Sequence, residues 1–508
     1  MASPLAGLAV WSSAVEHICG LSTRALDRAR MSRDPRFDGK FFIAITSTRI
    51  YCRPICPSPH ARRHHVRYFP TAAAATAAGF RPCLRCRPEA APGTPAWLGT
   101  SAVVSRALRM IEDGFLDRRP VNALAARLGL GARHLQRLFV QHVGGPPASV
   151  AQTRRLHFAK RLLDETNLPI TDIVFAAGFN SVRRFNSAFH QTFRRPPRDF
   201  RRARHEHAAS DRDEIVLRLT YRPPYDWAQV REFLAVRSVA GVELVDGNAY
   251  TRTVANDAGV AVVRISPAKG EAALELRVTA ATPSSLLQIS AAARRVFDVA
   301  ADPSTIAAAF RGDPLLGPLV RKRPGLRIPG VWDPFECAVR AVVGQQISVR
   351  GACTLMARLV RSCGHSIRSS SGRLTHVFPT ATQLAGADLS GVGLTRARAA
   401  ALRSLAKAAA EGALDWQAAP DEVRQSLIAL PGIGEWTAEY VALRALGEPD
   451  AFPASDLVLR RMAAHADCAP LSVRAMHERA ESWRPWRGYA ALYLWRAAAE
   501  QMKTRGGL

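Results

Sequence analysis

The sequence predicts a multidomain, mostly α-helical protein in which two blocks also contain β-strands. The chain has 508 residues, which at about 150 residues per domain suggests three or four domains. Its composition, 48% hydrophobic and 22% charged, is typical of chains that bury cores and argues against a disordered or fibrous protein. Strand patterns occur at 41–45 and from 215 to about 300, whereas helical periodicity fills 101–200 and the region from about 301 onward.

Two linker-like segments divide the chain. The stretch APGTPAW at 91–97 and the charged run at 201–214 lack the periodicity of the blocks around them. Together with the change of pattern near residue 300, they predict four domains. These are a small α/β domain (1–95), an all-α domain (96–205), an α+β domain (212–300) and a second all-α domain (301–508).

The net positive charge indicates what kind of molecule the protein binds. Lys and Arg exceed Asp and Glu by 28, which favours a polyanion, either nucleic acid or an anionic membrane. Only six of the 70 basic residues are Lys, so the Arg bias of a GC-rich genome is an alternative source of the excess. Charge alone leaves both explanations open.

Membrane insertion and secretion are not expected. Arg residues interrupt the longest apolar stretches, such as 97–111, well short of the roughly 18–20 residues that a span needs. The N-terminus lacks a basic segment before its apolar part, so no signal peptide is expected. Nine cysteines, four of them crowded into residues 52–86, indicate a cytoplasmic protein with one metal site rather than a disulfide framework.

The crowded cysteines form two pairs. Three residues separate Cys52 from Cys56, two separate Cys83 from Cys86, and 26 lie between the pairs. This spacing suits a tetrahedral four-cysteine zinc site. Residues 49–87 contain eight Arg and no Asp or Glu, so an exposed thiolate there would lie in a basic surface suited to DNA. A purely structural zinc knuckle is the alternative that spacing leaves open.

The sequence around these cysteines resembles the N-terminal domain of the Ada adaptive-response regulators. The matching segments are DGKFFIAITSTRIYCRPIC (38–56) and AAGFRPCLRCRP (77–88). This resemblance implies that Cys52 is both a zinc ligand and the acceptor of a methyl group from a methylphosphotriester in DNA. Methylation would remove one negative charge from the site and so strengthen its binding to phosphate.

Two tandem helical units follow. Residues 121–142 predict a helix, a turn at 129–131 and a second helix, and residues 169–193 repeat this plan around Gly178. A helical core with a solvated Arg face would explain either unit alone, but two units joined by the helical stretch 147–166 indicate a pair of helix-turn-helix units.

This region, including its closing FRRPPRDFRR (193–202), resembles the AraC-type DNA-binding domain. The resemblance implies that each second helix enters the major groove, one helical turn of DNA apart. Arg and Asn suit bidentate contacts with bases, and flanking Arg suits phosphates. The candidate DNA-binding residues are Arg133, His134, Gln136, Arg137, Arg183, Arg184 and Asn186.

Residues 427–447 predict another helical hairpin. Its Pro-Gly-Ile-Gly turn contains Gly432 and Gly434, which let backbone amides approach a DNA phosphate at a helix N-terminus. Asp456 follows 22 residues after Gly434. A tight turn and a helix N-cap are the plain alternatives for each feature alone. In combination they resemble the helix-hairpin-helix DNA glycosylase superfamily, which has an essential Asp.

Three further segments resemble AlkA-type 3-methyladenine DNA glycosylase II: 221–227, 323–348 and 481–495, within a likeness covering about 215–497. The resemblance implies that the Asp456 carboxylate stabilises the oxocarbenium ion as the glycosidic bond breaks. It also implies an aromatic pocket that prefers positively charged bases such as 3-methyladenine and 7-methylguanine. The pocket candidates, for each of which an ordinary core position is the alternative, are Trp436, Tyr440 and Trp495.

Two positions refine the implied mechanism. Bifunctional members of the superfamily have a Lys where this chain has Trp436, so no Schiff-base lyase step is expected. Gln346 stands where the best-known relatives place an apolar wedge that fills the gap left by the flipped base. Gln346 is therefore a candidate DNA contact, but how it would hold the DNA open is not settled by the sequence.

Together these features predict a fused adaptive-response protein for alkylated DNA, with zinc as cofactor. The expected partners are alkylated and promoter double-stranded DNA and, for activation, RNA polymerase; we expect a nucleoid-associated monomer. No Pro-Cys-His-Arg motif is present, so direct reversal of O6-alkylguanine is not predicted. The competing hypothesis is a pure transcription regulator whose glycosylase-like half only aids DNA binding.

Overall fold

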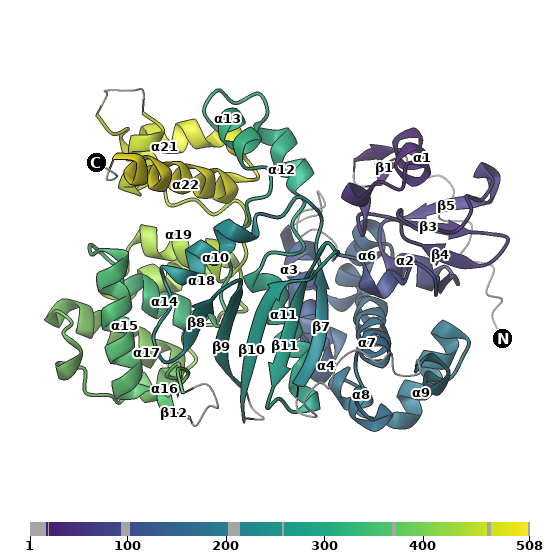
Figure 1. Cartoon of the computed structure of the whole chain (residues 1–508), viewed down its shortest axis with the longest axis horizontal. Helices are drawn as coiled ribbons and strands as arrows, with labels where there is room; N and C mark the ends of the chain where they lie inside the picture. Colours follow the sequence, from purple (N-terminus) through teal and green to yellow (C-terminus); the bar gives the residue numbers. More distant parts are fainter. Residues whose placement is uncertain are drawn as a thin grey trace.

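The computed structural model describes residues 17–18, 20–92, 102–201, 214–256, 259–367, 372–464 and 469–505. In chain order these form a cysteine domain (to residue 92), a helix-turn-helix domain (102–201), a sheet domain (214–300) and a helical domain (301–505). The sheet lies in the middle of the molecule (Figure 1), with the first two domains on one side and most of the helical domain on the other. We call residues up to 201 the N-terminal half and residues from 214 the C-terminal half.

The cysteine domain is a small mixed sheet flanked by two helices, as the sequence predicted. Its strands β3 (Phe42–Ile45), β4 (Ile50–Cys52), β5 (Val66–Phe69) and β6 (Arg81–Pro82) are ordered β5-β3-β4-β6, and its helices are α1 (Thr23–Met31) and α2 (Ala72–Ala77). The apolar run of β3 is buried in the centre of the sheet. Because β4 pairs in parallel with β6, the C-terminal ends of the two strands lie side by side. Cys52, the last residue of β4, is therefore close to Cys83, which directly follows β6.

The helix-turn-helix domain is helical throughout its described residues, in agreement with the sequence prediction. Its helices are α3 (Ala102–Glu112), α4 (Phe115–Arg118), α5 (Val121–Arg127), α6 (Ala132–Val143), α7 (Pro147–Glu165), α8 (Ile170–Ala176) and α9 (Val182–Phe193). The long helix α7 joins the two units and also packs against α2 of the cysteine domain. Helix α7 therefore contacts both helix-turn-helix units and the cysteine domain.

The sheet domain confirms the predicted alternation. Its strands are β7 (Glu214–Thr220), β8 (Glu243–Asp246), β9 (Ala249–Asn256), β10 (Gly259–Pro267) and β11 (Ala273–Thr279), in the antiparallel order β7-β11-β10-β9-β8, with helices α10 (Trp227–Ala235) and α11 (Leu286–Val296). Glu214, assigned to the linker from its charge, is instead the first residue of β7, where its carboxylate pairs with Arg277.

The helical domain is almost entirely α-helical. Its helices are α12 (Pro303–Phe310), α13 (Leu316–Lys322), α14 (Pro334–Val343), α15 (Val349–Cys363), α16 (Ala381–Ala385), α17 (Arg396–Ala410), α18 (Pro420–Ile428), α19 (Glu435–Arg444), α20 (Leu457–Met462), α21 (Val473–Ala480) and α22 (Arg487–Arg505). The all-α prediction omitted one short ribbon, β12 (His365–Ser366) with β13 (His376–Val377), too short to leave a period-two pattern. In the described parts of the chain, no helix is long and apolar enough to cross a membrane.

The two halves meet along the free edge of the sheet. β7 is an edge strand, and an uncovered edge presents unpaired backbone groups to other chains. Here α7 covers part of it: the Glu165 carboxylate accepts the Arg218 backbone N–H at 3.0 Å, and the Arg161 guanidinium donates to the Arg218 carbonyl. The N-terminal half thus supplies hydrogen-bond partners that a neighbouring strand would otherwise provide.

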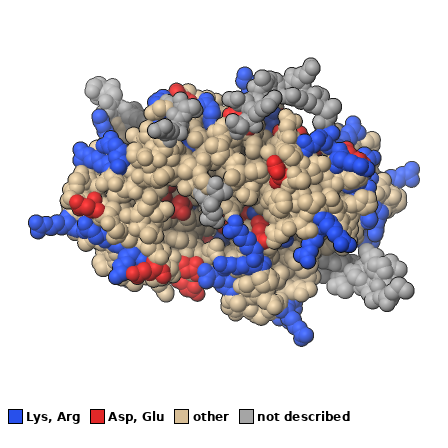
Figure 2. Space-filling model, turned by 90° about the horizontal axis from the view of Figure 1, so that it is seen from below, with Lys and Arg blue, Asp and Glu red and all other residues tan. Residues whose placement is uncertain are grey.

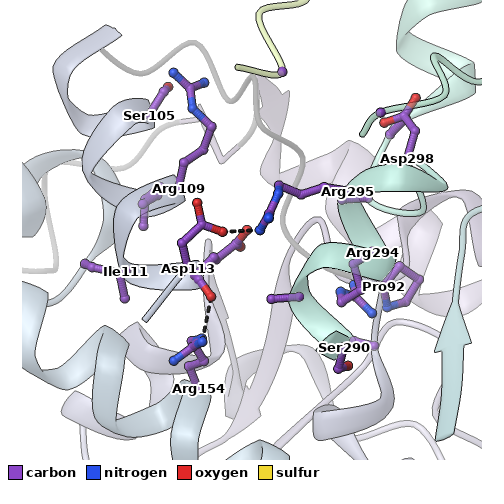
Figure 3. A pocket seen from close by; sticks show the side chains of 18 of the residues that line it. Pro92, Ser105, Arg109, Ile111, Asp113, Arg154, Ser290, Arg294, Arg295 and Asp298 are labelled. Carbon is purple, nitrogen blue, oxygen red and sulfur yellow. Dashed lines mark hydrogen bonds and ion pairs between the residues drawn. The ribbon is translucent and has the colours of Figure 1, made fainter. Parts of the chain in front are cut away.

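Ion pairs join the halves beyond the sheet edge. Arg295 on α11 pairs with Asp113 at the end of α3, and Arg109 on α3 pairs with Glu448 of the helical domain. Between these elements lies a cavity of about 410 Å³ (Figure 3), with side chains of α3 on one wall and of α11 on the other. The contact between the halves is therefore polar and incompletely packed.

Candidate metal centre, nucleic-acid interface and active site

The four cysteines converge on one point of the cysteine domain. Cys52 ends β4 and Cys83 follows β6, and the Cys83 backbone N–H donates to the Tyr51 carbonyl at 2.9 Å, which holds the two segments side by side. The sulfur atoms of Cys52, Cys56, Cys83 and Cys86 all lie within 4.8 Å of one another.

This donor set fits zinc. Tetrahedral zinc thiolates have Zn–S bonds of about 2.3 Å, which place the sulfurs roughly 3.8 Å apart. The upper limit of 4.8 Å between the observed sulfurs is compatible with this spacing, and the cluster consists of sulfur alone, a ligand type that zinc shares with few other metals of the cell. The structure therefore brings together the four cysteines that the spacing predicted, in an arrangement consistent with zinc.

Cys52 differs from the other three members of the cluster. It is partly exposed, whereas Cys56, Cys83 and Cys86 are buried. The Arg53 backbone N–H donates to Cys86 Sγ at 3.3 Å, and among the described residues no N–H donor is found at the Cys52 sulfur. Because an N–H donor withdraws negative charge from a thiolate, the Cys52 sulfur is more electron-rich than that of Cys86, and Cys52 is also the most exposed of the four residues.

The basic residues around the cluster divide into two groups. Two of the eight Arg act within the fold, since Arg53 pairs with Asp38 and Arg87 with Asp164. Others face solvent near the cluster: Arg62, Arg63, Arg67 and Arg85. Exposed His60 and His64 lie among them. The cysteine domain therefore presents basic side chains to solvent, as expected for a domain that meets phosphate.

Both helix-turn-helix units have their turns where the sequence placed them. Gly129 and Gly178 adopt positive φ angles of 69° and 78°, a region that favours glycine. In the second helices, Leu135 and Phe139 of α6 and Phe185 and Phe189 of α9 are fully buried. The candidate base-contacting residues lie on the opposite faces and are all exposed: Arg133, His134, Gln136, Arg137, Arg183, Arg184 and Asn186.

Basic side chains dominate the surface seen from below. In Figure 2 they spread around the edge of this face, and acidic side chains form only small groups between them. On this face the basic side chains therefore lie at the surface, as the net charge of +28 leads one to expect. Such a surface attracts a polyanion over several patches.

The predicted hairpin consists of α18, a turn at 431–434 and α19. Gly432 has a φ of 78°, and a Cβ there would lie 2.9 Å from the Ala401 Cβ, so a side chain would meet both strain and a clash. Gly434 caps the N-terminus of α19 and has open space where its Cβ would be. Backbone N–H groups at this helix start are thus open to an anion.

Asp456 both caps a helix and accepts a hydrogen bond from one of the candidate aromatic residues. Its Oδ1 accepts the Leu459 backbone N–H at 3.0 Å, which caps α20, and its Oδ2 accepts the indole N–H of Trp436 at 2.9 Å. Asp456 can therefore cap the helix and act in catalysis at the same time, because one carboxylate oxygen accepts from the helix and the other faces the aromatic residues.

The three aromatic candidates lie together. The rings of Trp436 and Tyr440, one turn apart on α19, are stacked with centroids 5.2 Å apart and planes 12° apart. Trp495 on α22 stands edge-on to Tyr440 at 6.4 Å. Offset-stacked and edge-on rings of this kind present an electron-rich surface to a base.

Sequence reasoning missed the neighbours of Tyr440. Arg444 donates to its hydroxyl at 2.9 Å and lies 4.4 Å from the centre of the Phe233 ring, on which Arg237 also stacks at 4.0 Å. Burial lowers the pKa of the Arg237 guanidinium. Phe233 and Arg237 belong to α10 of the sheet domain, so the site is shared between domains. The only sequence signal was their position just after the segment at 221–227.

Gln346 lies on the loop between α14 and α15, beside the hairpin. Its neighbour Gln345 donates to the Gly432 carbonyl at 3.0 Å and to the Thr437 hydroxyl at 3.1 Å, which fixes the loop next to Trp436. Gln346 is exposed and has a φ of 55°, uncommon for a residue with a side chain. The adjacent Ile347 is 36% exposed, so an apolar side chain is also available at this tip.

Comparison with known protein families covers nearly the whole chain. Residues 25–89 match the metal binding domain of Ada, residues 124–203 a helix-turn-helix domain, residues 216–333 the AlkA N-terminal domain and residues 339–487 the HhH-GPD superfamily of base excision DNA repair proteins. The four-cysteine cluster, the two exposed helix faces, the hairpin and Asp456 each lie within one of these matches.

Three curated proteins illustrate the relationship. The probable bifunctional transcriptional activator/DNA repair enzyme AlkA of Mycobacterium tuberculosis is 42% identical over 477 residues, covering 92% of this chain and 95% of that protein. DNA-3-methyladenine glycosylase 2 of Escherichia coli is 36% identical over 283 residues, covering 54% of this chain and 95% of that enzyme. The Escherichia coli Ada activator/repair enzyme is 36% identical over 151 residues, covering 29% of this chain and 40% of that protein.

The two Escherichia coli proteins thus correspond to parts of this chain, and the mycobacterial protein to nearly all of it. With the cysteine cluster, the paired helix-turn-helix units and the hairpin in their matched domains, the chain belongs to the bifunctional transcriptional activator/DNA repair enzymes that join an Ada-type regulator to an AlkA-type 3-methyladenine DNA glycosylase.

Proposed function

We propose that Cys52 accepts the methyl group of a DNA methylphosphotriester. The Cys52 sulfur attacks the methyl carbon and an S–C bond forms. The bond between that carbon and the phosphate oxygen breaks, and the oxygen keeps the electron pair, so that the repaired phosphodiester leaves as an anion. Zinc, when bound, keeps the four sulfurs deprotonated at neutral pH. The partial exposure of Cys52 in a cluster whose other members are buried is the observation that supports this assignment. The basic surface around it would hold the DNA backbone against the sulfur.

Methylation turns the regulator on electrostatically. It removes one negative charge from the cluster, which reduces repulsion of phosphate and strengthens DNA binding without a large motion. The exposed side chains of α6 and α9 then read promoter bases in two major-groove segments, and the DNA-bound protein, acting as a monomer, recruits RNA polymerase.

The C-terminal half excises alkylated purines such as 3-methyladenine and 7-methylguanine. The flipped base lies against Trp436, Tyr440 and Trp495, and its positive charge favours both cation–π attraction and departure from the sugar. As the glycosidic bond breaks, the Asp456 carboxylate stabilises the positive charge on the sugar, and water adds to C1′. The hydrogen bond from Trp436 to Asp456 supports this proposal most directly, because it fixes the carboxylate at the wall of the base pocket.

The enzyme is monofunctional. A lyase step needs an amine that forms a Schiff base, and Trp436 occupies the position of that Lys. Gln346 and the neighbouring Ile347, on the loop that Gln345 fixes to the hairpin, fill the gap in the duplex.

A base-release assay on methylated DNA tests the glycosylase. Wild type should release 3-methyladenine; no release by the folded wild type would instead support the alternative, a regulator whose C-terminal half only aids DNA binding. For the regulator half, mass spectrometry after incubation with DNA carrying methylphosphotriesters should find one methyl group on the peptide that contains Cys52. Its absence would support a purely structural zinc site.

A further inference from the structure

Three consecutive residues of the cysteine domain reach across to the C-terminal half. The backbone carbonyl of Asp38 accepts a hydrogen bond from Arg222 Nε at 2.9 Å. Lys40 forms an ion pair with Asp302, and the two side chains are only 9% and 6% exposed. Gly39, between them, has a φ of 74°. These contacts join residues separated by more than 180 positions in the chain.

Arg222 is at the centre of this contact and is completely buried, with an exposed fraction of 0%. Besides Asp38 it donates to the Ala300 carbonyl at 2.6 Å. Burial lowers the pKa of Arg222 to about 10, so its guanidinium stays charged at neutral pH. A Cβ on Gly39 would lie 3.0 Å from Arg222 Nη2 and 2.2 Å from the Pro92 carbonyl oxygen, so only glycine allows this approach.

On its other side, Asp38 leads to the cysteine cluster. Its carboxylate forms a buried ion pair with Arg53, whose Nε lies 2.8 Å from Oδ1. Arg53 directly follows Cys52, and it donates twice to Cys86, from its backbone N–H to Sγ at 3.3 Å and from Nη1 to the carbonyl at 3.1 Å. A continuous series of hydrogen bonds therefore runs from Arg222 through Asp38 and Arg53 to the cluster.

We infer that Arg222, a residue of the glycosylase half, is a positioning residue for the methyl-acceptor site. The inference rests on the proposed methyl acceptance by Cys52. Arg222 fixes the Asp38 peptide, the Asp38 carboxylate fixes Arg53, and Arg53 holds the Cys86 sulfur and the peptide that follows Cys52. Docking of the cysteine domain on the C-terminal half therefore adds a support to the acceptor site.

Loss of the Arg222 contact should lower both methyl acceptance and zinc retention. The N–H donor from Arg53 takes charge from the Cys86 sulfur and so makes Cys86 a weaker nucleophile than Cys52. Partners of this kind behind a metal ligand orient it, and their loss weakens both metal retention and reactivity. Arg222 reaches the cluster through Asp38 and Arg53, so its role is to position the acceptor site rather than to react.

The test uses the full-length, zinc-loaded protein and the variant Arg222→Gln. Arg264→Gln is the matched control, because Arg264 is an exposed residue of the same sheet, on β10. Three quantities are measured: the rate of Cys52 methylation by methylphosphotriester DNA, the rate of zinc transfer to a chromogenic chelator, and the release of 3-methyladenine.

Arg222→Gln should slow methylation and speed zinc transfer, each by about tenfold, while base release stays within about twofold of wild type. Arg222→Lys, which keeps the charge, should lie between the two. Equal methylation and equal zinc transfer in Arg222→Gln and Arg264→Gln would overturn the inference. If wild type and Arg264→Gln accept no methyl group, the proposed acceptor function fails instead, whatever the zinc transfer rates are.

A second variant covers the case in which Arg222→Gln does not fold. Lys40→Met removes the ion pair with Asp302 but leaves the caps that Asp302 makes to α12 through Ser304 and Thr305. It should change methylation and zinc transfer in the same direction as Arg222→Gln. A folded Lys40→Met variant that matches wild type in both rates would contradict a contribution of this docking contact to the acceptor site.

Discussion

The indole N–H of Trp436 donates to Oδ2 of Asp456 at 2.9 Å, and this single bond joins the start of α19 to the start of α20. The other carboxylate oxygen accepts from the Leu459 backbone. Both donors act on the same anionic group, so its orientation is fixed before any base arrives. Preorganisation of this kind is what charge stabilisation in a transition state requires.

Asp456→Asn should abolish most base release while preserving the fold. Asparagine is as good an N-cap as aspartate, so α20 keeps its cap. It carries no negative charge, and release of 3-methyladenine should fall by about 10²–10³-fold. Asp333→Asn, at the N-cap of α14, is the matched control and should retain normal release. Equal losses in the two variants would attribute the effect to capping rather than to catalysis.

Borohydride reduction should trap no covalent complex with DNA. Trapping requires an imine between an enzyme amine and C1′, and Trp436 offers none at the hairpin position. The measurement is a denaturing gel of protein and labelled methylated DNA after reduction, with a bifunctional glycosylase as positive control. A shifted protein–DNA band would show that another amine reaches the abasic site.

Cys52→Ser should lose methyl acceptance completely, since a serine hydroxyl is not ionised at neutral pH. Cys363→Ser provides the control, because Cys363 lies on α15, outside the cluster. Intact-mass spectrometry after incubation with methylphosphotriester DNA should show one added methyl group in the control and none in Cys52→Ser. Methylation that persists in Cys52→Ser would assign the acceptor to another sulfur.

Stability should decrease in mild acid because of His157. This half-buried residue of α7 is hydrogen-bonded to the Tyr51 hydroxyl at 3.1 Å, and desolvation, aided by the charge of Lys160, lowers its pKa from 6.5 to about 4. The folded state therefore binds this proton less readily than the unfolded chain. Stability is fully present above pH 6.5 and is lost as the pH falls toward 4.

The contribution of His157 to the free energy of unfolding should fall by about 2 kcal/mol between pH 7.5 and pH 5. Denaturant titrations of wild type and His157→Gln at both pH values measure it. Glutamine can bond the Tyr51 hydroxyl but does not titrate, so the variant should show a smaller pH dependence by that amount. An unchanged difference between the two pH values would remove His157 as the cause.

Arg183→Ala should weaken promoter binding without affecting base release. Arg183 is an exposed residue in the first turn of α9, where a recognition helix meets base edges. Loss of one bidentate base contact costs about 1–3 kcal/mol. Arg198→Ala, in the segment after α9, serves as the control. Fluorescence anisotropy on promoter DNA would distinguish the two, and equal affinities would exclude Arg183 from readout.

Local patterns were sufficient where function depends on spacing along the chain. The intervals among Cys52, Cys56, Cys83 and Cys86 predicted a cluster that the parallel pairing of β4 with β6 then produces. Periodicity placed the exposed faces of α6 and α9, because a helix converts sequence intervals directly into faces. Trp436 and Tyr440 lie one turn apart and stack for the same reason.

Contacts between segments that are far apart in the chain could not be predicted from such local patterns. Nothing local distinguishes Arg222, buried against Asp38, from the many exposed Arg of this chain. Phe233 and Arg237 join the pocket only because α10 of one domain packs beside Tyr440 of another. These positions are set by how domains dock, which depends on shape and on pairs far apart in sequence.

The covered edge of β7 has a consequence for how the C-terminal half would behave alone. Glu165 and Arg161 occupy backbone groups of a seven-residue strand that a solitary glycosylase half would expose to strand addition by its copies. A chain that lacks residues up to 201 would leave these backbone groups without Glu165 and Arg161 as partners. We therefore expect such a truncated chain to self-associate more readily than the full-length protein.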